Sequence, residues 1–224
     1  MSRPANKWLQ LKAFEAATSD YTHVVVSDCD KIFLEFADGW CDDSVRACKF
    51  IPRPTFEIFR DIFKLYFQTE PRFTIERADQ QDPGLDKRSY VNNHNGGLII
   101  FPVEQLPLLS ERWKHWIDEL MANPTLLQKN IRNLDQVALS LVMHEIESDI
   151  NFLPQTFDLG PNISSVSPHV LAEGSGQLVL HIHGYDDELG QVICGDKAPD
   201  NFRQYVQNLN REYVEWSSSV KLAA

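Results

Sequence analysis

The sequence predicts an α/β protein with a mixed, mostly parallel sheet flanked by helices. Two apolar runs, 21–27 and 98–101, are continuous rather than alternating, which is typical of parallel strands covered on both faces. Segments with helical periodicity alternate with such runs, as they do in α/β proteins. We expect helices over 6–18, 55–67, 103–121, 134–146 and about 200–216, and further strands over 150–154 and 177–182.

The expected helices have recognisable faces and ends. An aromatic stripe on the second helix is expected in the core, and it consists of Phe56, Phe59, Phe63 and Phe67. Asn133 can cap the fourth helix, which places Asp135 and Gln136 in its first turn. The polar segment 69–94 is expected to be a long surface loop, an uncommon feature unless it is functional.

The composition is that of an ordinary globular protein of 224 residues, and we expect a single domain over 1–224. The formal net charge of −11 argues against nucleic acid as a partner. Cys29, Cys41, Cys48 and Cys194 show no CxxC spacing, so reduced thiols in a cytoplasmic protein are expected. No apolar run approaches the roughly 18 residues of a membrane span, which predicts a soluble protein.

Two carboxylates follow the first expected strand directly. Asp28 and Asp30 stand one residue apart at the end of the valine run. A hard divalent cation relieves the repulsion between two such carboxylates and keeps positions for phosphate oxygens. The ends of parallel strands are also where open α/β sheets bind ligands. The pair therefore predicts a metal site, although Asp-x-Asp on a surface loop is usually a solvated turn.

Three other segments combine polar residues with strand or helix ends. Asn95, Gly96 and Gly97 lead into the strand at 98–101, where glycine permits close approach of a ligand and Asn95 can bond a sugar hydroxyl. Asp135 and Gln136 open a helix, where an Asp can simply stabilise the helix end. Taken alone, the first of these segments is better explained by a tight turn before a strand, and the second by stabilisation of the helix end.

The third segment is Leu180-His181-Ile182-His183-Gly184. Alternation along a strand places His181 and His183 on one face, where either can bind a metal or a phosphate. A structural role remains open for both histidines.

Taken in order, these segments resemble the GT-A class of glycosyltransferases, most closely glycosyltransferase family 8, the glycogenin and galactosyltransferase type. That family carries a Lys and then an aromatic residue ahead of a strand that ends in Asp-x-Asp, and Lys12 and Tyr21 match that pattern. Its Asn-x-Gly, Asp-Gln and late His-x-x-Gly elements are matched by Asn95-Gly96-Gly97, Asp135-Gln136 and His181-Ile182-His183-Gly184.

The resemblance implies transfer of a sugar from a nucleotide sugar, usually a UDP-sugar, to a glycan, lipid or protein acceptor. The metal, Mn²⁺ or Mg²⁺, would be held by Asp28, Asp30 and His181, with His183 as the second choice. Lys12, Asn95, Gly96, Gly97 and Asp135 would bind the donor, and Asp135 and Gln136 would serve the transfer step. Retention and inversion of the anomeric configuration both stay open.

The resemblance covers about 7–184, and 185–224 form a C-terminal extension. Family members begin with a nucleotide-binding portion ahead of this region, so the chain is expected to be truncated at its N-terminal side. A sheet without those strands has an exposed edge, which a second copy or a partner would cover. Tyr185-Asp186-Asp187-Glu188 also stands where the family has a basic contact to the diphosphate.

Two other classes remain open. In a phosphatase of the haloacid-dehalogenase type, Asp28 would be the nucleophile and Asp30 the acid and base, with Gly195-Asp196 and Asp200 as a late metal motif. That reading leaves Asn95-Gly96-Gly97, Asp135-Gln136 and His181 unexplained. The third class is a non-catalytic glycosyltransferase remnant that binds a sugar or a partner.

Overall fold

The computed structural model divides the chain into two compact units, residues 1–27 with 39–153 and residues 28–38 with 154–224. Each unit is described by itself. The residues that the structure describes are 6–15, 21–28, 31–33, 40–49, 54–75, 88–153, 179–181, 191–194, 196, 198 and 200–222.

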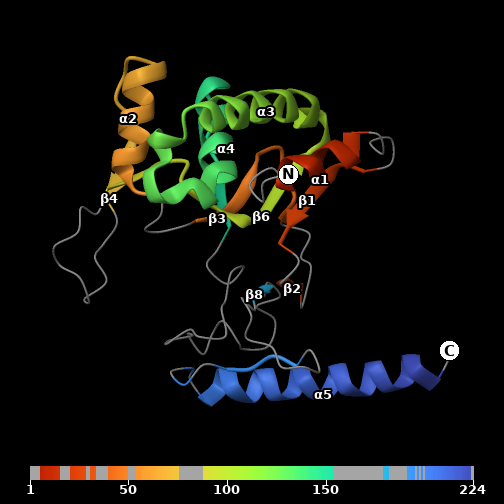
Figure 1. Ribbon diagram of the computed structural model, residues 1–224. Helices are drawn as coiled ribbons and strands as arrows, with labels where there is room; N and C mark the ends of the chain where they lie inside the picture. Colours follow the sequence, from red (N-terminus) through yellow and green to blue (C-terminus); the bar gives the residue numbers. More distant parts are fainter. Residues whose placement is uncertain are drawn as a thin grey trace. The chain divides into compact units, whose positions relative to one another are not determined.

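A four-stranded sheet forms the base of the first unit (Figure 1). Its strands lie in the order β1 (His23–Ser27), β6 (His94–Pro102), β3 (Arg46–Lys49) and β7 (Asn151–Leu153). Strand β6 runs antiparallel to both of its neighbours, whereas β3 and β7 are parallel. Among the described strands, β1 is therefore an edge of this sheet.

The expectation of a mostly parallel sheet is wrong for these strands, because two of the three pairings are antiparallel. The apolar run 98–101 is buried on both faces because β6 is a central strand, and all nine of its residues are buried. Strand β1 carries the valine run, yet only Val24 and Val26 are fully buried. The unbroken apolar run correctly indicated that β6 is a central strand. Such a run does not indicate whether the strand is parallel or antiparallel to its neighbours.

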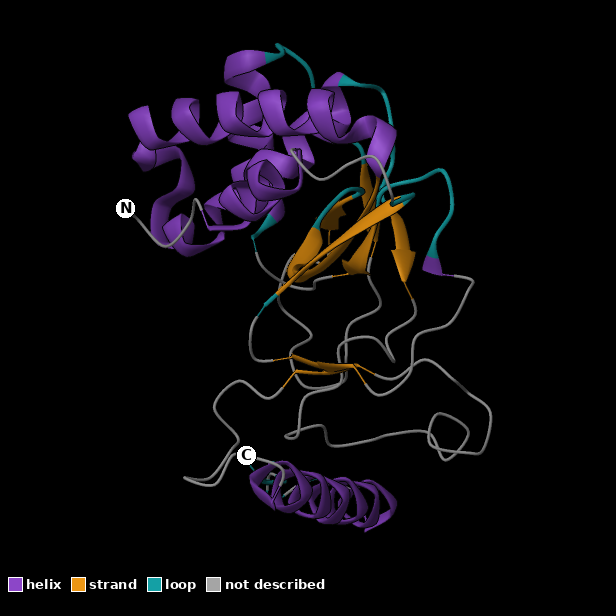
Figure 2. Ribbon diagram, turned by 90° about the vertical axis from the view of Figure 1, so that its right-hand side faces the viewer, coloured by secondary structure: helices purple, strands orange, loops and turns teal. Residues whose placement is uncertain are grey.

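The helices of the first unit lie together on one side of this sheet (Figure 2). Helix α3 (Leu106–Ala122) packs along α4 (Leu134–Glu145), and α1 (Asn6–Glu15) contacts both α3 and β1. Helix α2 (Phe56–Tyr66) packs on β5 (Arg88–Tyr90) and on the 3₁₀ segment η4 (Pro124–Asn133). A short 3₁₀ turn, η3 (Val103–Gln105), joins β6 to α3. The four helices expected from periodicity in this part of the chain are confirmed.

The core of the first unit lies between the sheet and the helices. Phe56, Phe59 and Phe63 of the aromatic stripe are buried there. The expected apolar face of α3 is buried too, and it consists of Leu106, Leu109, Trp113, Trp116, Ile117 and Leu120. The indole Nε1 of Trp113 donates to the backbone oxygen of Asp135 at 2.9 Å, which ties α3 to the first turn of α4.

The segment 69–94 is not a simple surface loop, so that expectation is wrong for its described parts. Strands β4 (Phe73–Ile75) and β5 form a two-stranded antiparallel ribbon, and residues 76–87 lie outside the described residues. Asn92 is fully buried. Its Nδ2 donates to the oxygen of Ser148, and its Oδ1 accepts from the backbone N–H of Ile150. This asparagine thus holds the chain that enters β7.

In the second unit, β2 (Lys31–Phe33) and β8 (Val179–His181) form an antiparallel pair. Helix α5 (Asp200–Leu222) is longer than expected and starts where the sequence predicted. The chain also passes through an isolated bridge residue, Val192, which exchanges two hydrogen bonds of 2.8 Å with the side-chain amide of Asn210 on α5. None of the described helices combines the length and apolarity needed to cross a bilayer.

Replacing Asn92 by alanine should lower the free energy of unfolding by about 1–3 kcal/mol, because the buried N–H of Ile150 loses its acceptor. Urea denaturation followed by circular dichroism measures this loss. Thr125→Ala is the matched control, since Thr125 is exposed and its replacement should change stability by less than about 0.5 kcal/mol. Equal effects of both substitutions would contradict the structural role of Asn92.

Candidate functional site

The Asn-Gly-Gly segment forms an irregularity at the start of β6. Ala47 of β3 lies opposite Ile99, yet the next residue, Cys48, lies opposite Asn95, so β6 has three more residues than β3 at this place. The side chain of Asn95 stabilises the irregularity, because its Oδ1 accepts a hydrogen bond from the N–H of Gly97 at 2.8 Å. Bulges of this kind bend a strand and re-aim its residues, and they are frequent beside functional sites.

Gly96 lies in tight contact with two helices. A Cβ atom placed on Gly96 would stand 2.7 Å from Nζ of Lys7 on α1 and 3.0 Å from Cγ of Gln136 on α4. Both distances are shorter than nearly all contacts that real Cβ atoms make with other heavy atoms in proteins. Only a residue without a side chain brings β6 this close to Lys7 and Gln136, so close approach explains the glycine.

Lys7 forms an ion pair with Asp135 in the first turn of α4. Lys7 Nζ lies 3.6 Å from Asp135 Oδ2, and the side chains are 13% and 11% exposed. Burial of a charge is costly unless an opposite charge is paired with it, so each of these side chains offsets the cost of burying its partner. Four residues from three elements thus meet in the first unit. We call this group, Lys7, Gly96, Asp135 and Gln136, the Lys7 cluster.

A buried imidazole stands beside the Lys7 cluster. His94, the first residue of β6, is fully buried, and its Nδ1 lies 3.2 Å from the backbone oxygen of Asn92 and 3.4 Å from Oγ of Ser140 on α4. Burial lowers the pKa of His94 to about 4, and the positive charge of Lys7 acts in the same direction. The imidazole is therefore neutral near pH 7.

The structure brings part of the predicted site together. Gly96, Asp135 and Gln136 lie in the Lys7 cluster. Asn95 stabilises the bulge through its contact with Gly97. The sugar contact that the glycosyltransferase resemblance implies for Asn95 stays a prediction. Lys7 and His94 were missed. A signal for His94 was present, since it is a titratable residue between two asparagines at the start of a buried strand.

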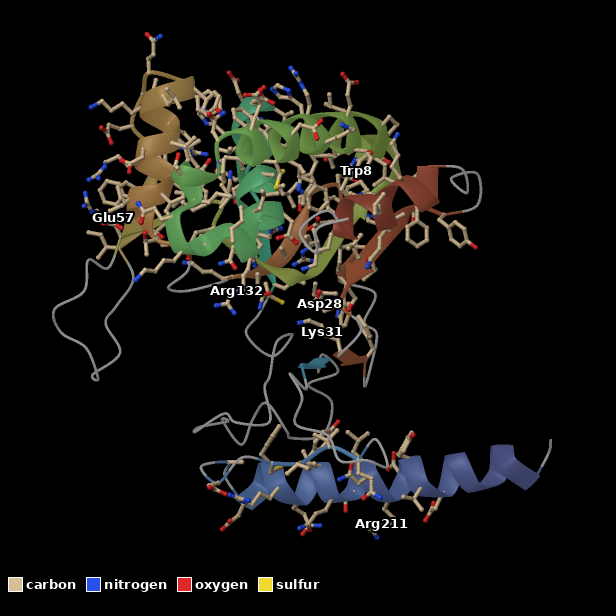
Figure 3. The ribbon with its side chains drawn as sticks, viewed as in Figure 1. Trp8, Asp28, Lys31, Glu57, Arg132 and Arg211 are labelled. Carbon is tan, nitrogen blue, oxygen red and sulfur yellow. The ribbon has the colours of Figure 1, made fainter. Side chains whose placement is uncertain are left out.

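Lys12 lies elsewhere on α1. It lines an open groove of about 720 Å³ between α1 and α3, together with Trp8, Ser110 and Lys114. Trp8, labelled in Figure 3, donates its indole N–H to the backbone oxygen of Ser110 at 3.0 Å. Lys12 is five positions after Lys7, and this step rotates a side chain by about 140° around a helix axis. The two lysines therefore belong to different faces of α1. The role of Lys12 in donor binding stays a prediction.

The predicted metal ligands belong to the second unit. Strand β2 begins at Lys31, directly after the Asp28-Cys29-Asp30 segment, and Lys31 pairs with His181 of β8. Asp28 and Lys31 are labelled in Figure 3. Opposite residues in an antiparallel pair have Cα atoms about 5 Å apart, so the backbone of His181 lies close to Lys31, the residue that follows the acidic motif in the sequence. Two segments that are distant in sequence are thus paired where the acidic motif ends.

Much of this centre lies outside the described residues, namely Cys29, Asp30, His183 and the side chain of His181. Among the described side chains there is no group of three candidate metal ligands. The residue types of the predicted site suit a divalent metal. Carboxylate oxygens suit Mg²⁺ and Mn²⁺, and an imidazole is a common further ligand for transition metals.

The late aspartates of the phosphatase alternative lie at the start of α5. Asp196 is in a turn, and Asp200 is the first residue of the helix. Arg203 donates to the backbone oxygens of Ala198 and Asp196, at 2.9 and 2.6 Å. This guanidinium stabilises the turn through main-chain contacts, and Gly195, Lys197 and Pro199 lie outside the described residues.

Comparison of the sequence with models of known protein families gave no match, and comparison with curated proteins gave none either.

The stability of the protein should depend on pH through His94. Its pKa is about 4 in the folded state and about 6.5 in an unfolded chain, so only the unfolded state takes up this proton as the pH falls below 6.5. The His94 contribution is complete above about pH 6.5 and should fall by about 2 kcal/mol between about pH 7.5 and pH 5.

Urea denaturation of the wild type and of His94→Asn at both pH values measures this contribution, because all other titrating groups are common to the two proteins. His94→Asn should lose less stability on acidification. His115→Asn, at an exposed position on α3, is the control and should behave as the wild type does. Identical pH dependence in all three proteins would show that His94 is not a buried neutral imidazole.

Proposed function

We propose that this chain is a metal-dependent glycosyltransferase that uses a nucleotide sugar, most simply a UDP-sugar, as donor. The observation that carries the proposal is the contact of Gly96 with Gln136, next to Asp135. These residues come from two separate motifs of the glycosyltransferase pattern, and they meet at Gly96 because this residue has no side chain. The phosphatase alternative assigns no role to either motif.

The metal part of the proposal rests on the second unit. Asp28, Asp30 and His181 would hold Mn²⁺ or Mg²⁺, and the pairing of Lys31 with His181 supports this assignment. The metal would supply charge neutralisation of the departing diphosphate. The protein's own contribution would be to hold two carboxylates on a short, covalently constrained segment and a histidine on the neighbouring strand.

The sugar part of the proposal rests on the Lys7 cluster. Asp135 offers carboxylate oxygens and Gln136 an amide, and both are fixed by the first turn of α4, whose backbone is tied to Trp113. Such groups bind sugar hydroxyls and orient the anomeric carbon, so positioning supplies much of the rate. Lys7 pairs with Asp135 in a place that is nearly buried. The acceptor would be a glycan, a lipid or a protein.

The metal assignment predicts Mn²⁺-dependent binding of UDP, measured by isothermal titration calorimetry. Asp28→Asn should weaken this binding at least about tenfold, because a neutral amide is a poorer ligand than a carboxylate. Asp118→Asn is the matched control. Asp118 pairs with Lys114 on the exposed face of α3, and its replacement should leave UDP affinity unchanged.

Two results would contradict the metal assignment. UDP binding that is independent of Mn²⁺ would remove the metal from the site. Mg²⁺-dependent release of phosphate from an aryl phosphate, abolished by Asp28→Asn, would favour the phosphatase. Metal-dependent UDP binding without any sugar transfer or donor hydrolysis would identify a non-catalytic remnant.

Gly96→Ala tests the sugar part. The new methyl group would displace the ends of Lys7 and Gln136, so the affinity for a UDP-sugar should fall about tenfold or more while binding of UDP alone changes little. The cost in stability should be about 1–3 kcal/mol. Ala138→Gly, which removes a methyl group from the buried face of α4, serves as a control for destabilisation. Unchanged sugar affinity in Gly96→Ala would contradict the proposed site.

A further inference from the structure

The side chain of His94 has one ring nitrogen that the fold does not use. Nε2 is buried and has no hydrogen-bond partner among the described residues, whereas Nδ1 lies within reach of the backbone oxygen of Asn92. A carbonyl oxygen only accepts, so Nδ1 carries the proton and Nε2 bears a lone pair. A buried acceptor without a donor costs stability, so a structure that keeps one needs a reason for it.

Strand β6 contacts helix α4 at two neighbouring positions, one at His94 and one at Gly96 of the Lys7 cluster. His94 contacts Ser140, and Gly96, two residues further along β6, contacts Gln136. Gln136 and Ser140 are four residues apart and therefore lie on the same face of α4. Lys7 lies against Gly96, and its charge acts on the imidazole of His94. The unused acceptor thus belongs to the same interior as Asp135 and Gln136.

We propose that Nε2 of His94 accepts a hydrogen bond from a hydroxyl group of the donor sugar. The inference rests on the proposed function and adds a donor-binding residue to it. A neutral imidazole with its proton fixed on Nδ1 accepts from a hydroxyl and has no proton at Nε2 to donate to a phosphate oxygen. Because His94 stands beside the Lys7 cluster, which is assigned to the donor sugar, the hydroxyl proposed here is that of the sugar and not that of the ribose. A ligand that supplies this donor satisfies an atom that the fold leaves unsatisfied.

Gly96, two residues along β6 from His94, is covered by flexible side chains of the Lys7 cluster. The atoms against Gly96 are the end of Lys7 and the outer part of Gln136, both long and unbranched side chains. The Lys7–Asp135 distance of 3.6 Å is longer than a close charged hydrogen bond. A ligand can therefore displace these ends by changes of rotamer, while the bulge held by Asn95 stays in place.

Two substitutions distinguish the role of Nδ1 from the role of Nε2 in His94. In His94→Asn the amide nitrogen replaces Nδ1 as donor to Asn92, and nothing replaces Nε2. In His94→Gln the longer side chain can place its amide oxygen near the position of Nε2. His94→Asn should bind UDP-glucose or UDP-galactose, whichever the wild type prefers, about three- to tenfold more weakly, with unchanged affinity for UDP. His94→Gln should recover part of the loss.

The binding measurements use calorimetry with Mn²⁺ on the full chain. Ile62→Ala, in the core at α2, controls for loss of stability and should keep both affinities. Nitrogen NMR of the histidine side chains gives an independent readout. The Nε2 signal, assigned by its absence in His94→Asn, should move to lower frequency when the UDP-sugar is added and stay in place when UDP is added.

The outcomes distinguish the two proposals. If the wild type prefers the UDP-sugar to UDP and His94→Asn keeps that full preference, the inference about His94 is overturned and the proposed function stands. Equal weakening of UDP and UDP-sugar in His94→Asn also overturns the inference, since it indicates a structural effect. If the wild type binds neither ligand in the presence of Mn²⁺, the proposed function fails and the inference falls with it.

Discussion

The packing of the first unit depends on the burial of the polar residues at the start of strand β6. Strand β6 is buried along its whole length, so His94, Asn95, Gly96 and Gly97 lie in the same interior as the apolar residues that follow. Polar groups in such a place cost stability unless they are bonded within the protein. The fold meets this requirement locally, through the contacts of Asn95 with Gly97 and of His94 with Asn92. Helix α4 adds Ser140, whose Oγ lies 3.4 Å from Nδ1 of His94, whereas Nε2 of His94 has no partner among the described residues.

Helix α4 and helix α1 bring opposite charges to this interior. Asp135 enters with the first turn of α4, and Lys7 enters from the start of α1. Removal of either partner would leave a nearly buried charge uncompensated, which is strongly destabilising. The close approach of these side chains requires Gly96. The same contacts that make the interior stable therefore gather carboxylate, amide, ammonium and imidazole groups, a set that binds hydroxyl-rich ligands well.

The sequence predicted this arrangement only in part, and the reason lies in which interactions are local. Helix α3 and strand β6 follow from apolar patterns within single segments, and both were predicted. Strands β2 and β3 have three and four residues, too few to show a period, and they depend on distant partners, β8 and β6. The pairing of Lys7 with Asp135 depends on which face of α1 meets α4, which a weakly patterned helix does not reveal.

Under the proposed function, charge balance makes the binding of the nucleotide sugar depend on a divalent metal. The chain has a net charge of −11, and a diphosphate adds further negative charge. The charge of Lys7 is already balanced by Asp135, and Lys114 at the α1–α3 groove is balanced by Asp118. Where the glycosyltransferase pattern has a basic contact, this chain has Asp186, Asp187 and Glu188. A divalent cation inverts the local charge without any change of protein residues, so a nucleotide diphosphate should bind this chain as its metal complex or hardly at all.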